Sequence, residues 1–217
     1  MKIRIILADD HAIVRQGLSR AIGQEEDMDV IGQAPNGRAT IDLVRKLSPD
    51  ILITDISMPD LNGVEATRQV LRECPAVKVI ALSMHSSRQF VMEMFRAGAM
   101  GYLLKDCDYD ELVKAIHTVA EGKVYVSPSI GDVIVEDLLN GRQAGAPTAF
   151  SLLTPREREV LQLMAEGNTT RQIARRLYIS PKTVEAHRLR VMNKLDIDNV
   201  AQLTKYAIQE GLTSPEI

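Results

Sequence analysis

The chain has 217 residues, which allows one large domain or two small ones. Hydrophobic residues make up 45% of the chain and tryptophan is absent, so we expect an aliphatic core. No apolar run approaches the roughly 20 residues that cross a bilayer. The start, MKIRIILADD, reaches acidic residues too early for a signal peptide, and Cys74 and Cys107 have no metal-ligand spacing. We therefore expect a cytoplasmic protein with two free thiols and no membrane contact.

Charge is spread unevenly along the chain. The net charge is −3, but residues 1–149 contain 16 basic and 21 acidic residues, whereas residues 150–217 contain 10 basic and 8 acidic ones. An acidic front and a mildly basic back indicate two domains with different partners.

The front of the chain alternates short apolar runs with helical patterns. Strands that are apolar throughout and separated by helices indicate a parallel sheet covered on both faces. Right-handed crossovers then give a doubly wound α/β domain with five parallel strands, which we place at residues 1–122. Strands are predicted at 3–8, 28–34, 51–54, 78–82 and 101–105, and helices at 13–22, 38–47, 64–73, 87–97 and 109–121.

The back of the chain is predicted to be a linker followed by helices. Residues 123–150 form the linker, with a possible helix around 134–139 and a second half rich in Gly, Ala and Pro. Residues 151–217 form a compact domain of four helices, the last of them at about 199–210. Capping signals start the first three helices, with caps at Thr154, Thr169 and Ser180.

Polar side chains follow the strands of the predicted sheet where each strand ends. Asp9 and Asp10 follow the first strand, Asp55 the third, Ser83 the fourth, and Lys105 ends the fifth. Because the carboxyl ends of parallel strands meet at one edge, we expect these residues to converge near the switch in strand order. Three carboxylates packed together resist ionisation, and a Mg²⁺ ion, which prefers oxygen ligands, removes that problem. Lys105 adds a compact charge suited to a phosphoryl group, and Ser83 adds a hydroxyl donor.

Taken singly, each of these residues has a simpler explanation. A lone Asp at a strand end usually caps a loop, a lone Lys is usually solvated, and a lone Ser is nearly uninformative. Five of them at the same end of successive strands are hard to obtain by chance, which favours a functional site. His11 and His85 flank it, but an imidazole suits zinc better than Mg²⁺, so we expect both around the site and not on the metal.

The stretches LADDH, LITDISMPDLNG, ALSMH and GYLLKD resemble the receiver domain of two-component response regulators, over about residues 1–122. The resemblance implies a flavodoxin-like fold with Asp55 as the phosphoacceptor. It also implies a Mg²⁺ ion held by Asp9, Asp10, Asp55 and the backbone carbonyl of Ser57.

The same resemblance implies a covalent switch. Asp55 takes a phosphoryl group from a sensor histidine kinase, or from a small phosphodonor, and Lys105 contacts that group. The new charge attracts the Ser83 hydroxyl and Tyr102 turns inward, which remodels the surface nearby. Asp106 departs from the family pattern, because many receivers have proline at this position.

Residues 170–195 have the pattern of a helix, a three-residue turn and a second helix, which is a helix-turn-helix. The second helix has a net charge of +3 between residues 182 and 194. On a helical wheel its core face contains Val184, Val191 and Leu195. In the major groove of DNA, the outward residues would read bases and one flank would touch phosphates. The outward set is Lys182, Glu185, Ala186, Leu189 and Asn193, with Arg190 at the margin, and the flank set is Thr183, His187 and Lys194.

A solvated charged face would also explain this charge, but the capped pair of helices favours DNA. LTPREREVLQLMAEG and IARRLYISPKTVEAHRLRVMNKL resemble the LuxR-type helix-turn-helix of the NarL/FixJ subfamily, over about residues 150–212. The last helix either pairs two copies on DNA, as the resemblance implies, or packs within its own domain. Two copies would bind half-sites roughly one helical turn apart.

These features together predict a transcriptional regulator whose binding to double-stranded DNA, as a homodimer, depends on phosphorylation. It would catalyse only its own aspartyl phosphorylation and dephosphorylation. The alternative is a phosphorylation-independent DNA-binding regulator with a vestigial pocket, which the complete set of pocket residues disfavours. A phosphatase with an aspartyl nucleophile is a third possibility, but it leaves the helical tail unexplained, and no second acid follows Asp55 two residues later.

Overall fold

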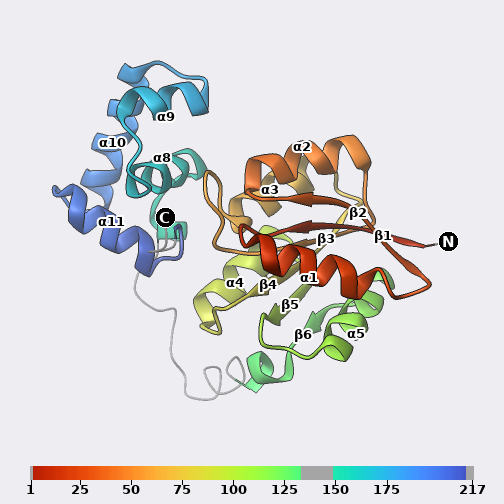
Figure 1. Cartoon of the computed structure of the whole chain (residues 1–217). Coiled ribbons are helices and arrows are strands. Elements are labelled where there is room, and N and C mark those ends of the chain that lie inside the picture. The colour runs from red at the N-terminus through yellow and green to blue at the C-terminus, as the bar shows by residue number, and fades with distance from the viewer. Residues whose placement is uncertain (1, 133–148, 214–217) are drawn as a thin grey trace. The chain divides into compact units, whose positions relative to one another are not determined.

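The computed structural model of the chain describes residues 2–132 and 149–213 (Figure 1). It forms two compact units, made mainly of the first and the second of these ranges respectively. In the part of the chain that is described, no helix is both long enough and apolar enough to cross a membrane. Cys74 and Cys107 are free thiols, which confirms the prediction from their spacing.

The first unit is built on a six-stranded sheet in which all neighbouring strands are parallel, in the order β2-β1-β3-β4-β5-β6. All five predicted strands are present, with bounds that agree to within a residue. The sixth strand was not predicted, because a strand of two residues shows no periodicity. The strands are β1 (Ile3–Ala8), β2 (Met28–Ala34), β3 (Ile51–Thr54), β4 (Lys78–Ser83), β5 (Gly101–Leu104) and β6 (Tyr125–Val126).

Helices cover both faces of this sheet (Figure 1). On one face Ile5 and Leu7 of β1 join an apolar cluster that also contains Ile22 of α1 and Ile116 of α5. Ile6, which lies between Ile5 and Leu7 in β1, points to the opposite face, as the alternation of a strand requires, and it is also buried. The helices are α1 (Ala12–Ile22), α2 (Gly37–Leu47), α3 (Gly63–Glu73), α4 (Arg88–Ala97) and α5 (Tyr109–Ala120).

The second unit is helical, and its helices begin where the capping signals predict. Thr154 and Thr169 each form a reciprocal capping box, and the Ser180 side chain accepts from the backbone N–H of Thr183. Apolar residues from three of the helices, such as Val160 and Val184, form the core. The helices are α7 (Ala149–Leu152), α8 (Pro155–Ala165), α9 (Thr170–Leu177), α10 (Pro181–Leu195) and α11 (Val200–Gln209).

The prediction of four helices omitted the single turn of α7. Arg158 of α8 explains this turn, since its Nη1 atom donates to the carbonyl oxygens of Phe150, at 3.1 Å, and of Leu153. Its guanidinium carbon also lies 5.3 Å from the centre of the Phe150 ring. In the segment predicted as a linker, residues 128–132 are helical, and the possible helix around 134–139 lies outside the described residues.

Candidate functional site

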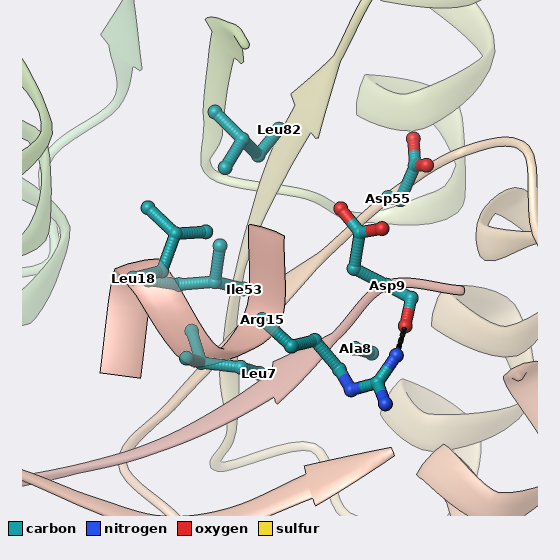
Figure 2. A pocket seen from close by; sticks show the side chains of 8 residues that line it. All are labelled: Leu7, Ala8, Asp9, Arg15, Leu18, Ile53, Asp55 and Leu82. Atoms are coloured by element: carbon teal, nitrogen blue, oxygen red, sulfur yellow. Dashed lines mark hydrogen bonds between the residues drawn. The ribbon is translucent and has the colours of Figure 1, made fainter. Parts of the chain in front are cut away.

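The strand order brings the predicted acidic residues to one edge of the sheet. The chain leaves β1 toward β2 on one side and returns to β3 on the other, so Asp9 and Asp55 end neighbouring strands at the switch point. Both are 4% exposed. Asp9, Asp10, His11 and Asp55 can each offer one ligand atom so that all of these atoms lie within 4.8 Å of one another. Figure 2 shows the carboxylate of Asp9 directed toward that of Asp55.

The loop that carries Asp55 is held rigidly by its own backbone. The Asp55 N–H donates to the carbonyl of Ala8 at 2.7 Å, and the Ile56 N–H donates to Oδ1 of Asp55 at 2.6 Å. The first residue of α3 must be glycine, because a Cβ atom on Gly63 would lie 1.9 Å from the carbonyl oxygen of Asp55. The stretch from 55 to 63 therefore folds back on itself and fixes the carboxylate in place.

Lys105 neutralises part of the charge in this pocket. Its Nζ atom lies 2.7 Å from Oδ2 of Asp9 and 2.7 Å from Oδ2 of Asp55. Burial raises the pKa of Asp55, although Lys105 acts in the opposite direction. Burial also opposes the charge on Lys105, but the two carboxylates outweigh it and the pKa of the ammonium is raised. One ammonium is thus shared between two buried carboxylates.

The donor set fits a hard divalent cation. Within the described residues three carboxylates, those of Asp9, Asp10 and Asp55, meet a single ammonium, so the pocket keeps an excess of negative charge. Carboxylate oxygens are the ligands that Mg²⁺ prefers. The Nδ1 atom of His11 lies 3.2 Å from Oδ1 of Asp9 and 2.9 Å from Oδ1 of Asp10, so this ring contacts the acids.

The loop after β4 connects the pocket to α4 through His85. The backbone N–H of His85 donates to Oγ of Ser83 at 3.1 Å, and its Nε2 atom lies 3.0 Å from Oγ of Ser57. Its carbonyl accepts from the hydroxyl of Tyr102 at 2.6 Å, and its ring stacks on Phe90 with centroids 4.4 Å apart. Burial lowers the pKa of His85, and the positive charge of Lys105 adds to that effect, so the ring is harder to protonate than a free imidazole.

Tyr102 already occupies an inward position in this structure. Its side chain is fully buried, and the bond to the His85 carbonyl compensates for removing the hydroxyl from water. The resemblance to receiver domains implies this position only after phosphorylation. The expected location of His85 around the site is correct, but its contacts with Ser57, Ser83 and Phe90 depend on rotamers that spacing does not reveal.

Arg15 is a further residue of the site that spacing does not predict. It lies on α1 and lines a small cavity together with Asp9, Asp55 and five apolar residues (Figure 2). Its Nη1 atom donates to the backbone carbonyl of Asp9. In sequence it looks like an ordinary exposed residue of an amphipathic helix, so only the structure links it to the pocket.

In the second unit, α10 presents the outward face that the helical wheel predicts. Val184 and Val191 are 1% and 0% exposed, whereas Leu189 is 60% exposed. Most of the residues proposed to meet DNA reach solvent, and Ala186 and His187 are half-buried. The exposed ones are Lys182, Thr183, Glu185, Leu189, Arg190 and Lys194.

Two of these side chains are held by neighbours within the unit. Thr170 donates from Oγ1 to Oε1 of Glu185 at 2.7 Å. The Nζ atom of Lys194 lies 2.7 Å from Oε2 of Glu157, the capping-box acid of α8. Burial lowers the pKa of His187, and the positive charges of Arg190 and Arg156 add to that effect.

Comparison with known proteins identifies both units. Residues 5–117 match the response regulator receiver domain, and residues 151–207 match the bacterial regulatory proteins of the luxR family. The chain belongs to the response regulators of the NarL/FixJ type. It is 36% identical to the transcriptional regulatory protein DegU of Brevibacillus brevis, over 97% of this chain and 94% of DegU. It is 35% identical to the oxygen regulatory protein NreC of Staphylococcus carnosus, over 97% and 99%.

Solved structures of response regulators resemble this chain, some of them along nearly its whole length. RcsB from Salmonella enterica serovar Typhimurium, bound to promoter rprA in the presence of the phosphomimetic BeF3−, has 28% identity and a TM-score of 0.63. The match covers 95% of this chain and 98% of RcsB. A LuxR-family response regulator from Aurantimonas sp. SI85-9A1 has 35% identity and a TM-score of 0.62, over 64% of this chain and 99% of that one. The family consists of DNA-binding transcription regulators and not of enzymes.

Proposed function

We propose that Asp55 accepts a phosphoryl group from a phosphohistidine of a sensor histidine kinase. One oxygen of the Asp55 carboxylate attacks phosphorus, the phosphorus–nitrogen bond breaks, and the departing imidazole nitrogen takes up a proton. The observation that carries this proposal is the pocket itself, where a buried, rigidly held carboxylate shares the Lys105 ammonium with Asp9 at 2.7 Å. A nucleophile at this strand end is both fixed and close to the positive charge that the transferred group needs.

We propose that Asp9, Asp10, Asp55 and the backbone carbonyl of Ser57 hold a Mg²⁺ ion. The excess of carboxylates over ammonium groups in the pocket supports this set. When bound, the ion supplies positive charge that offsets the charge of the phosphoryl oxygens. Lys105, released from the carboxylates, then contacts the transferred group.

The contacts of His85 suggest how the signal leaves the pocket. We propose that a phosphoryl oxygen attracts the Ser83 hydroxyl, which now accepts from the His85 N–H. The loop then moves as a unit, because Tyr102 holds the His85 carbonyl and Phe90 of α4 stacks on its ring. Since Tyr102 already lies inward, phosphorylation would stabilise this position and would not create it. Coupling of this kind is typically ~1–3 kcal/mol, enough to shift a population.

We propose that α10 enters the major groove of double-stranded DNA. Lys182, Glu185, Ala186 and Leu189, with Arg190 at the margin, would face base edges. Thr183, His187 and Lys194 would face the phosphates. Lys194 can serve a phosphate while paired with Glu157 because an ammonium has three hydrogens, and His187 would contribute a hydrogen bond.

We further propose that two copies bind DNA together through α11 and that the protein acts in the cytoplasm, where kinase and DNA meet. Val200 at the start of α11 is 42% exposed, which supports a surface available to a second copy. Half-sites would then lie about one helical turn apart.

Intact-mass measurement after incubation with MgCl₂ and acetyl phosphate tests the phosphoacceptor. We expect the wild type and an Asp106→Asn control to gain one phosphoryl group and Asp55→Asn to gain none. No gain in the wild type would favour the regulator with a vestigial pocket, and rapid multiple turnover of the donor would favour a phosphatase. Chromosomal footprinting of wild type against Asp55→Asn then tests the switch, and identical footprints would contradict it.

A further inference from the structure

Arg15 holds the backbone that carries both acids of the β1 end. It lies in the first turn of α1, and its Nη1 atom donates to the carbonyl oxygen of Asp9 (Figure 2). That carbonyl belongs to the peptide bond between Asp9 and Asp10. Because the peptide group is planar, the direction of its oxygen fixes the plane from which both side chains start.

The remaining polar atoms of Asp9 are held as well. Its N–H donates to the carbonyl of Ala34 at 3.1 Å, and its Oδ1 accepts from the backbone N–H of His11 at 2.8 Å. Its Oδ2 faces Lys105 at 2.7 Å. A cation at this site would take the place of Lys105 at Oδ2, whereas the Asp9 carbonyl that Arg15 holds lies on the other side of the residue (Figure 2).

The charge of Arg15 is not used in an ion pair. No carboxylate among residues 2–132 and 149–213 lies within ion-pair distance of its guanidinium, and its Nε atom is buried without a hydrogen-bond partner there. A buried guanidinium nitrogen without a partner is costly. The position of this half-buried group beside a cation site is therefore explained by what the guanidinium does to the Asp9 carbonyl and not by charge pairing.

We propose that Arg15 is a positioning residue for the divalent cation, one that aims Asp9 and Asp10 by fixing the peptide between them. The inference rests on the proposed Mg²⁺ site. It extends the site from its ligands to a group on α1 that contacts neither the cation nor the phosphoryl group. Loss of such a supporting group typically weakens metal binding by about 10- to 100-fold.

A positioning role and a purely electrostatic role of Arg15 predict opposite changes in Mg²⁺ affinity when the side chain is removed. If Arg15 were only a positive charge near the carboxylates, its removal would relieve repulsion and tighten Mg²⁺ binding. If it aims the carboxylates, its removal loosens them and weakens binding. Arg15→Lys separates the electrostatic role from the positioning role further, because lysine keeps the positive charge but lacks the planar, forked donor geometry of the guanidinium.

Isothermal titration of the metal-free full chain with MgCl₂ measures this directly. We expect Arg15→Gln and Arg15→Lys each to raise the Mg²⁺ dissociation constant about tenfold or more. The control, Arg20→Gln in the last turn of the same helix, should bind as the wild type does. Circular dichroism melting checks that each variant is folded, and Arg15→Lys keeps the test available if Arg15→Gln does not fold.

Phosphorylation by acetyl phosphate gives a second readout. With the Arg15 variants the Mg²⁺ concentration for half-maximal rate should rise, while the rate at saturating Mg²⁺ stays near that of the wild type. Unchanged or tighter Mg²⁺ binding by both variants would overturn the positioning role. Absence of Mg²⁺ binding by the wild type would instead overturn the proposed metal site.

Discussion

Replacing Lys105 by methionine tests whether its ammonium and a divalent cation serve the same carboxylates. The substitution replaces the ammonium by an uncharged, unbranched side chain that is shorter by a single heavy atom. Asp9 and Asp55, each with a side chain 5% exposed, would then face one another without the ammonium that lies 2.7 Å from both. We expect a less stable chain whose stability depends strongly on Mg²⁺.

The size of the loss follows from the burial of the three groups. Breaking a buried ion pair by removing one partner costs about 3–5 kcal/mol, because an uncompensated charge stays behind. The pocket lies at the edge of the sheet, where some hydration is regained, so we expect about 3 kcal/mol in the absence of metal. Mg²⁺ at about 100 times its dissociation constant stabilises the variant by about 2.7 kcal/mol, which brings it close to the stability of the metal-free wild type. The wild type should gain less at the same Mg²⁺ concentration, because its Lys105 ammonium competes with the ion for the two carboxylates.

Urea unfolding followed by circular dichroism, in EDTA and in excess MgCl₂, measures the free energy of unfolding without and with the metal. Urea is chosen because it is uncharged and does not screen the ion pairs of the pocket. The control is Lys123→Met, which removes an exposed ammonium 2.6 Å from Glu121, far from the pocket in sequence and without a metal cluster. Its stability should respond to Mg²⁺ as that of the wild type does. A loss for Lys105→Met that is equal in EDTA and in MgCl₂ would refute the view that the two cations share these oxygens.

Three further predictions follow from single contacts. Gly63→Ala places a Cβ atom 1.9 Å from a backbone carbonyl oxygen and should cost about 3 kcal/mol in urea unfolding, whereas Gly17→Ala, with open space around it, should stabilise α1 by about 1 kcal/mol. Lys194→Met leaves the buried Glu157 unpaired and should cost about 1–2 kcal/mol, so an unchanged unfolding midpoint would contradict this role of the pair. Burial, reinforced by nearby carboxylates, raises the pKa of the Cys107 thiol to about 11 from 9.0. At pH 8 iodoacetamide should therefore modify Cys107 about 100-fold more slowly in the folded chain than in the urea-unfolded chain, and equal rates would exclude the shift.

The fold could be predicted largely from the sequence because its strands are buried on both faces. A run such as Ile51–Thr54, in which all four residues are buried, has no charged residue that could suggest a different element. Two of the elements that were not predicted, β6 and α7, lack such a signal. β6 is an edge strand whose residues are only half-buried, and α7 is a single turn set by Arg158, eight residues from the Phe150 carbonyl that it holds.

The residues of the pocket could be predicted from the sequence where the order of the strands alone brings them together. Parallel strands put Asp9, Asp55 and Lys105 at one edge whatever their rotamers, so chain order was enough. Arg15 acts through a hydrogen bond from its side chain to the backbone of Asp9, and His85 through a hydrogen bond from its backbone to the side chain of Ser83. Both bonds depend on the conformation of the loops after β1 and β4. No spacing rule contains that information.

The helical wheel of α10 likewise does not show which of its side chains are already held by neighbouring helices. The wheel separates most of the core from the surface, since Val184 is buried and Leu189 is exposed, but Leu195, which it places in the core, is only half-buried. It does not show that Thr170 on α9 already uses one carboxylate oxygen of Glu185, or that Lys194 is shared with α8. A side chain that must read a base has to keep its groups available, so Glu185 has one free oxygen with which to accept from a cytosine amine. Thr170→Val would free the other oxygen, and a change in base preference at a single operator position would then identify Glu185 as the residue that reads it.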